Sequence, residues 1–171
     1  MGGLPHFAGV AGIALLAITS IAYADGAGDP KAVSEQDGKW VDKNGTPTFH
    51  IEGKKVDFYT YEGYLRYSEN CLRCHGPDGL GSTYAPSLVD SLQHMGYQDF
   101  VGIVSGGKQD VTAAQTLVMP ALGTDRNVMC YIDAIYVYLR ARSDEALGRE
   151  RPQEHDPKPA AFKEAENQCM G

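Results

Sequence analysis

The chain has 171 residues, of which 43% are hydrophobic and 22% charged, an ordinary composition for one globular domain. Lysine and arginine number 15 against 22 aspartate and glutamate residues, which gives a formal net charge of −7. An acidic chain with no block of basic residues argues against a nucleic-acid-binding protein.

The first 24 residues have the pattern of a cleaved signal peptide. Residues 10–18 form a short apolar core, and Ala22-Tyr23-Ala24 places small residues at the third and first positions before the expected cut. The apolar run is short for a membrane span of about 20 residues. No Lys or Arg precedes it, however, so an uncleaved anchor is the competing interpretation. A cleaved signal implies export, without stable membrane insertion, to a compartment where disulfides persist.

Residues 25–59 are expected to form an N-terminal extension. Within residues 39–51, two short apolar stretches flank Asn44-Gly45, a dipeptide that favours the tight turn of a β-hairpin because both turn positions need positive φ. We therefore predict a small hairpin there. Trp40 and Phe49 would cover part of a core, and docking of a partner is the alternative role.

Residues 60–142 are expected to form a mainly helical domain, because their apolar residues recur at helical spacing. Helices are predicted over 61–70, 87–95, 97–105 and 126–142, with a loop over 76–87. No stretch of this domain alternates long enough to predict a sheet. Residues 143–171 are charged and Pro-rich, which predicts a polar C-terminal tail.

The pentapeptide Cys71-Leu72-Arg73-Cys74-His75 is C-x-x-C-H, the signature of covalent haem attachment. Two thiols one helical turn apart can each add to a vinyl group on one edge of a porphyrin. The adjacent histidine can then reach the iron as its proximal ligand. The motif predicts one covalently bound haem c held by Cys71, Cys74 and His75.

Other interpretations of the C-x-x-C spacing explain the sequence less well. A structural zinc site usually needs a second ligand pair, and the chain has no second C-x-x-C and no H-x-x-x-H. A thioredoxin-like motif should lie in a βαβ setting, which is not predicted here. A disulfide between Cys71 and Cys74 would leave His75 unexplained.

Met119 is the candidate for the second axial ligand of the iron. It lies in an apolar segment, residues 116–123, and Pro120 biases it away from helical geometry, so its thioether can project from a loop. A methionine opposite a histidine raises the reduction potential. Packing in a core is the ordinary role of a methionine. The competing ligand candidates are Met129, His94, Met95 and His50.

With these motifs in place, residues 60–142 resemble the class I cytochromes c. The matching residues are Gly63 and Tyr67 before the C-x-x-C-H motif, Pro86, Met119-Pro120, and Ile135-x-x-Tyr138-Leu139. The resemblance implies the helical fold of that family around one haem. It also implies a helix crossing at Gly63, beside Tyr67 and Tyr138. Pro86 would supply the backbone carbonyl to which His75 hydrogen-bonds.

A narrower resemblance covers almost the whole mature chain. Residues 37–40, 74–88, 127–142 and 169–171 look like the four-cysteine c-type cytochromes of methanol metabolism. This implies a periplasmic electron carrier and not an enzyme. Its donor would be a PQQ-dependent methanol or alcohol dehydrogenase, in particular the lanthanide type, with the calcium type as the near alternative. Its acceptor would be a downstream cytochrome or oxidase.

The two remaining cysteines, Cys130 and Cys169, fit this resemblance as a disulfide that ties the tail to the last helix. A loop of that size would stabilise the fold by about 3–4 kcal/mol on the chain-entropy model. Two free thiols are the alternative, which export disfavours. Without the disulfide we expect residues 144–168 to be largely disordered. The held tail either shapes part of a partner surface or simply stabilises the fold.

Two other functions remain open from the sequence. A haem enzyme or ligand sensor would need a displaceable sixth ligand, and Met119 argues against that. A cytochrome subunit of another periplasmic dehydrogenase complex would retain its N-terminal segment as an anchor. For the electron carrier, the net charge of −7 predicts transient docking steered by electrostatics, with a reduction rate that changes with ionic strength.

Overall fold

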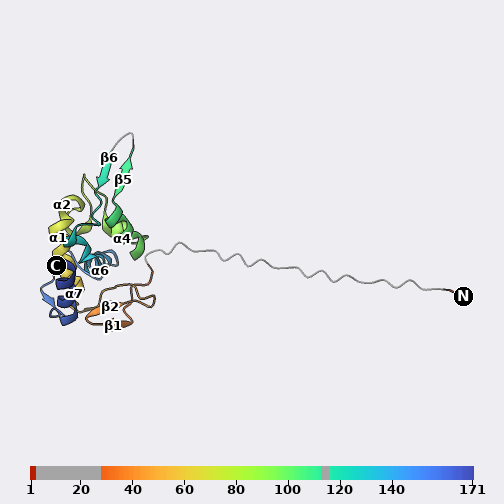
Figure 1. Ribbon diagram of the computed structural model, residues 1–171, viewed down its shortest axis with the longest axis horizontal. Helices are drawn as coiled ribbons and strands as arrows, with labels where there is room; N and C mark the ends of the chain where they lie inside the picture. The colour runs from red at the N-terminus through yellow and green to blue at the C-terminus, as the bar shows by residue number, and fades with distance from the viewer. Residues whose placement is uncertain (3–27, 113–115) are drawn as a thin grey trace.

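The computed structural model describes residues 1–2, 28–112 and 116–171 (Figure 1). Apart from its first two residues, the predicted signal peptide lies outside the described residues. In the part of the chain that is described, no helix is long and apolar enough to cross a membrane. The helical elements are α1 (Phe58–Asn70), α2 (Leu72–His75), the 3₁₀ turn η1 (Pro77–Gly79), α3 (Leu88–Ser91), α4 (Tyr97–Gly106), α5 (Arg126–Met129), α6 (Ile132–Ser143) and α7 (Ala160–Met170).

Three small sheets accompany the helices. Strands β1 (Ser34–Gln36) and β2 (Lys39–Val41) form one antiparallel pair, and β5 (Lys108–Val111) and β6 (Thr116–Met119) form another. The third sheet joins β3 (Ile51–Glu52), β4 (Lys55–Val56) and β7 (Glu154–His155), with β4 and β7 parallel. The helices therefore form the body of the fold, and the strands are short additions to it.

The centre of the fold is the crossing of α1 and α6. Asp57 begins α1, because its carboxylate accepts a hydrogen bond from the Thr60 backbone nitrogen at 2.9 Å. Gly63 lies at the crossing itself. A Cβ on Gly63 would lie 1.9 Å from the Ala134 carbonyl oxygen and 2.7 Å from the Tyr138 Cβ. Only glycine allows the two backbones to approach this closely.

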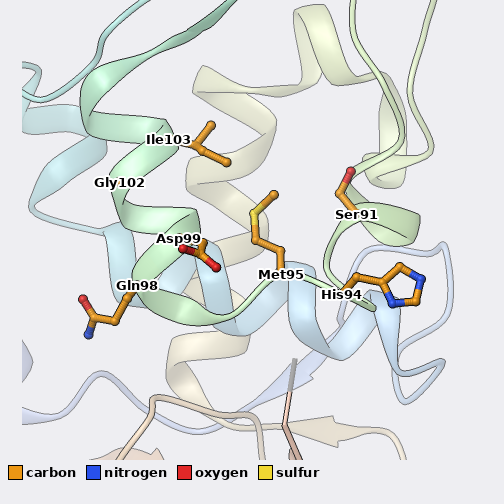
Figure 2. A pocket seen from close by; sticks show the side chains of 7 residues that line it. All are labelled: Ser91, His94, Met95, Gln98, Asp99, Gly102 and Ile103. Carbon is orange, nitrogen blue, oxygen red and sulfur yellow. The ribbon is translucent and has the colours of Figure 1, made fainter. Parts of the chain in front are cut away.

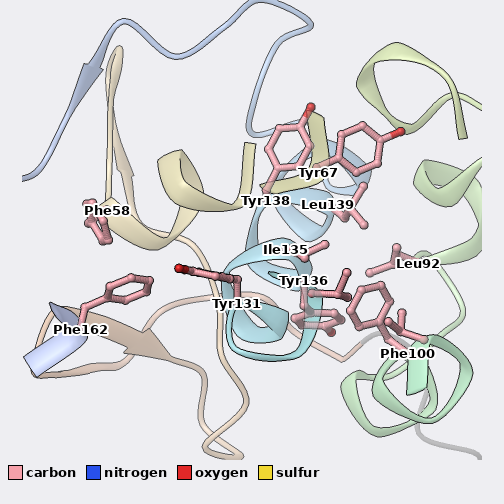
Figure 3. Packing of buried hydrophobic residues seen from close by; sticks show 12 residues of the cluster. Phe58, Tyr67, Leu92, Phe100, Tyr131, Ile135, Tyr136, Tyr138, Leu139 and Phe162 are labelled. Carbon is pink, nitrogen blue, oxygen red and sulfur yellow. The ribbon is translucent and has the colours of Figure 1, made fainter. Parts of the chain in front are cut away.

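A largely aromatic core surrounds this crossing. Figure 3 shows Ile135, Tyr136 and Leu139 of α6 among side chains from the elements packed around it. Tyr67 and Tyr138 have ring centroids 5.4 Å apart, and each ring is almost completely buried. Burial of each such side chain contributes on the order of 2 kcal/mol. The core therefore fixes α1, and with it the Cys71–His75 motif at its end.

The predicted helix over 126–142 is divided into α5 and α6. Tyr131 has φ −121° and ψ 14°, which is outside helical geometry, and it separates the two helices. Its ring lies under the Arg66 guanidinium, 3.6 Å from ring centroid to Cζ, and its hydroxyl donates to Glu166 at 2.8 Å. The break thus presents Cys130 and Tyr131 to the C-terminal tail.

The predicted hairpin around Asn44-Gly45 is not confirmed. The dipeptide does form a turn, in which the Asp42 carboxylate accepts from the backbone nitrogens of Asn44 and Thr46. Only a single bridge, between Val41 and Pro47, follows from it, flanked by hydrogen bonds from the Asp42 nitrogen to the Thr46 carbonyl and from the Thr48 nitrogen to the Trp40 carbonyl. The hairpins of the extension are instead β1–β2 and β3–β4. Trp40 stacks on His50 with ring centroids 4.1 Å apart and does not join the buried cluster.

The expectation that residues 60–142 contain no sheet is wrong. Strands β5 and β6 pair over four residues each. Every residue of β5 is exposed, so the strand has no buried face to give its sequence an alternating pattern.

The tail is more ordered than its composition predicts. The disulfide between Cys130 and Cys169 is confirmed. Helix α7 also packs by its own contacts. Phe162 is 6% exposed and lies edge-on to Phe58 and Tyr59, with centroid distances of 4.9 and 5.1 Å. The division of the chain into an extension (25–59), a cytochrome domain (60–142) and a tail (143–171) stays a prediction.

Replacing both Cys130 and Cys169 by serine is expected to lower the free energy of unfolding by about 3–4 kcal/mol, while α7 stays docked. The reason is that burial of Phe162 and the Glu166 contacts remain, and these contacts lead us to revise the expectation that residues 144–168 are largely disordered without the disulfide. Chemical denaturation would measure the loss, and amide hydrogen exchange would follow α7. Adding Phe162→Ala should then release the helix. Loss of α7 protection in the serine variant alone would contradict this expectation.

Candidate haem-binding site

The two cysteines of the C-x-x-C-H motif are both free; Cys71 is the N-cap residue of the short helix α2, and Cys74 lies within that helix. Cys71 ends α1, and the His75 backbone nitrogen donates to its carbonyl at 2.9 Å, which closes the single turn of α2. Cys71 is half-buried and Cys74 is exposed. Burial, with a smaller contribution from Cys74, raises the pKa of the Cys71 thiol to about 12. The two thiols therefore lie one turn apart, one of them at the surface.

His75 is held for ligation by a backbone carbonyl. Its side chain is 8% exposed, and Nδ1 lies 3.1 Å from the Pro86 carbonyl oxygen. With the proton on Nδ1, this nitrogen donates to Pro86 and leaves Nε2 as a lone-pair donor for a metal. Pro86 is the partner that the family resemblance implies for His75.

The loop after His75 is tied back to the motif by hydrogen bonds. The Gly81 nitrogen donates to the His75 carbonyl at 2.8 Å, and the Tyr67 hydroxyl donates to the Gly76 carbonyl at 2.5 Å. A Cβ on Gly76 would lie 2.3 Å from the Gly81 carbonyl oxygen. The loop therefore closes tightly under α2, and Pro86 is carried back to His75.

Arg142 and Arg149 both hydrogen-bond to Asp78 in this loop. The sequence did not predict these contacts. Asp78 has φ 67°, a left-handed conformation that is uncommon for a residue other than glycine. Arg149 Nε lies 2.8 Å from the Asp78 carboxylate, and Arg142 Nε lies 3.4 Å from its carbonyl. Arg142 also donates to the Leu147 carbonyl at 2.5 Å. Arg149 thus bonds the tail to the loop that supports His75. Asp78 and Arg149 are 71 residues apart in the sequence, so no local pattern could reveal their contact.

Met119 ends β6 and is half-buried against the hydrophobic core. Gly107, with φ 76°, allows the segment to pass close to the end of α4, since a Cβ there would lie 2.8 Å from the Met119 carbonyl oxygen. The Leu122 nitrogen then donates to the Val104 carbonyl at 3.0 Å. The strand and these bonds hold Met119 on an extended backbone. The role of Met119 as an iron ligand stays a prediction.

The competing ligand candidates have other surroundings. His50 stacks on Trp40, and Met129 packs against the core. His94 and Met95 line a shallow pocket of about 630 Å³ beside α4. Figure 2 shows Met95 directed toward the space beside Ile103, with His94 pointing away from it. None of the cysteines, nor His75 or Met119, lines this pocket.

These residues fit a covalently attached haem. Two free thiols stand one turn apart, an imidazole has one nitrogen fixed and the other free, and a half-buried thioether lies on a rigid strand. Within residues 28–112 and 116–171, no group of three or more His, Cys, Asp or Glu side chains could hold a bare metal ion. The fold and the site together define a protein that carries haem c through one C-x-x-C-H motif.

Comparison with known proteins agrees with this class. No protein-family model matches the chain. Cytochrome c-553I of Paracoccus denitrificans is 50% identical over 136 residues, which are 79% of this chain and 60% of that protein. Cytochrome c-555 of Methylococcus capsulatus is 33% identical over 90 residues, which are 52% of this chain and 67% of that protein.

Among solved structures, c-type cytochrome XoxG from Methylobacterium extorquens AM1 matches with a TM-score of 0.76 and 54% identity, covering 82% of this chain and 86% of that one. The chain therefore belongs to the c-type cytochromes, a family that binds haem c covalently. The predicted cofactor and the helical fold are confirmed. Its relatives are electron carriers and not enzymes, in agreement with the sequence.

Proposed function

We propose that the protein is a periplasmic electron carrier that accepts single electrons from a PQQ-dependent methanol dehydrogenase and passes them to a downstream cytochrome or oxidase. The likeness to XoxG, at 54% identity over 86% of that chain, carries the proposal. The four-cysteine pattern supports it, since the tail and its Cys130–Cys169 disulfide belong to the resemblance to methanol-metabolism cytochromes. The predicted signal peptide and the disulfide support the periplasm.

The chain would hold its cofactor with little movement between redox states. Haem c, when bound, supplies a one-electron couple between ferric and ferrous iron. The Pro86 carbonyl fixes the orientation of His75, and the β5–β6 pairing fixes the backbone at Met119. Cys74 is exposed, so the chain leaves the side at which this cysteine would hold the group accessible to a partner. A partner could therefore exchange electrons there without opening the fold.

The test is reduction of the haem-loaded ferric protein by a PQQ dehydrogenase supplied with methanol, followed in stopped flow through the ferrous absorption band. Fast, saturable reduction by the lanthanide enzyme, the calcium enzyme or both is expected, and comparison of their rates would identify the donor type. If neither enzyme reduces the protein, the methanol assignment is wrong and the donor of this cytochrome lies elsewhere.

A further inference from the structure

The β5–β6 ribbon has two faces of different character. Figure 1 shows it projecting from the helical body. In the antiparallel register, Met119 is opposite Lys108 and Leu117 is opposite Asp110, so these four side chains share one face. The other face carries Val111 with Thr116 and Val118 with Gln109.

Burial distinguishes these faces. On β6, Leu117 and Met119 are half-buried, so this strand turns their side toward the fold, whereas every residue of β5, Lys108 and Asp110 included, is exposed. Val111 and Val118 are 64% and 57% exposed. A ribbon in water normally turns polar residues outward, and charged side chains protect exposed strands from unwanted pairing. Here both charged residues of the ribbon, Lys108 and Asp110, are on the Met119 face, and the outer face has no charge.

Other exposed apolar side chains belong to the segments that build the haem site. In the described residues, the large hydrophobic residues with exposed side chains are Met1, Val33, Leu72, Leu80, Tyr84, Val111 and Val118. All but Met1 and Val33 lie in the C-x-x-C-H motif, the loop after it or the ribbon. Within the ribbon, Val111 and Val118 share one face, and exposed apolar side chains that share a face are typical of an interaction surface.

The charge of these segments differs from that of the whole chain. Residues 71–88 contain one Arg and one Asp, and residues 107–123 contain one Lys and one Asp, so each segment has a formal net charge of zero. The whole chain carries −7. The acidic excess therefore lies in other parts of the sequence, and the haem-site segments offer no charge of one sign to attract a partner.

We propose that the outer face of the ribbon, formed by Gln109, Val111, Thr116 and Val118, is a docking surface for the electron donor and fits an uncharged, apolar patch on that enzyme. The inference rests on the proposed function. Val118 is the neighbour of Met119 on β6, so a donor on this face lies on the opposite side of the same strand from the predicted ligand. Docking then depends on burial of apolar surface, which is the alternative to the electrostatic steering expected from the net charge.

The test compares Val118→Lys with Val33→Lys in the haem-loaded protein. Val33 is 56% exposed, almost the same as Val118, but lies in the N-terminal extension. We expect Val118→Lys to lower the second-order rate of reduction by the dehydrogenase on the order of ten-fold, and Val33→Lys to leave it unchanged. Val111→Lys, on the other strand, should resemble Val118→Lys. Reduction by dithionite, which needs no docking face, reports whether each haem site is intact.

Three outcomes would overturn the inference while the proposed function stands. In the first, the wild type is reduced but Val118→Lys and Val33→Lys react at the same rate, so docking occurs elsewhere while the proposed function stands. In the second, the wild-type rate depends strongly on ionic strength, which would assign docking to charge. In the third, sedimentation shows a wild-type dimer that Val118→Lys disrupts, which would assign the face to a second copy of this chain. If neither dehydrogenase reduces the wild type, the proposed function itself fails, and the inference fails with it.

Discussion

Replacing Gly63 by alanine is expected to lower the free energy of unfolding by about 3 kcal/mol or more, enough to threaten folding of the whole chain. The added Cβ would lie 1.9 Å from the Ala134 carbonyl oxygen, which is backbone and cannot rotate away. Helices α1 and α6 would have to separate, and the Tyr67–Tyr138 contact between them would open. Denaturant titration of the haem-loaded protein would measure the loss.

Gly102 provides the matched control. It also lies inside a helix, α4, but a Cβ there would meet nothing within 4 Å. Gly102→Ala should therefore leave stability unchanged or raise it by up to about 1 kcal/mol, because alanine is the better helix former. Equal effects of the two substitutions would mean that the crossing at Gly63 is not as close as the structure gives it.

Replacing Met119 by leucine is expected to abolish the absorption band of methionine-ligated ferric haem and to lower the reduction potential. Methionine opposite histidine favours the ferrous state, and axial ligands set haem potentials over a range of about 0.8 V, so we expect a shift on the order of 0.1 V. Leucine has a similar volume, so the fold should lose less than about 1.5 kcal/mol. Ferric absorption spectra and a redox titration would measure both effects.

Met129→Leu and Met95→Leu are the controls, since both residues pack against the core and were the competing thioether candidates. Neither should change the ferric band or the potential. Should the band survive in Met119→Leu and disappear in one of the controls, that other methionine is the ligand. A ferric band absent from the wild type would exclude methionine ligation altogether and would reopen the haem enzyme or ligand sensor.

The chemistry of the site could be predicted from local spacing alone. The haem-attachment motif spans five residues, about one helical turn, and contains Cys71, Cys74 and His75. No tertiary contact is therefore needed to bring these side chains together. The crossing at Gly63 and the carbonyl of Pro86 required the family resemblance, because a glycine and a proline have many ordinary roles. The structure places both where the resemblance implies.

Contacts between distant segments were decided by the tertiary structure. Arg149 reaches Asp78 across 71 residues, and Phe162 is a lone aromatic in a polar tail whose burial depends on Phe58 and Tyr59 being positioned first. The β5–β6 ribbon has no alternating pattern because one of its strands is entirely exposed. Sequence by itself determined the cofactor, through covalent chemistry within five residues. Only the fold decided what surrounds it, because that depends on segments that meet after α1 and α6 have packed.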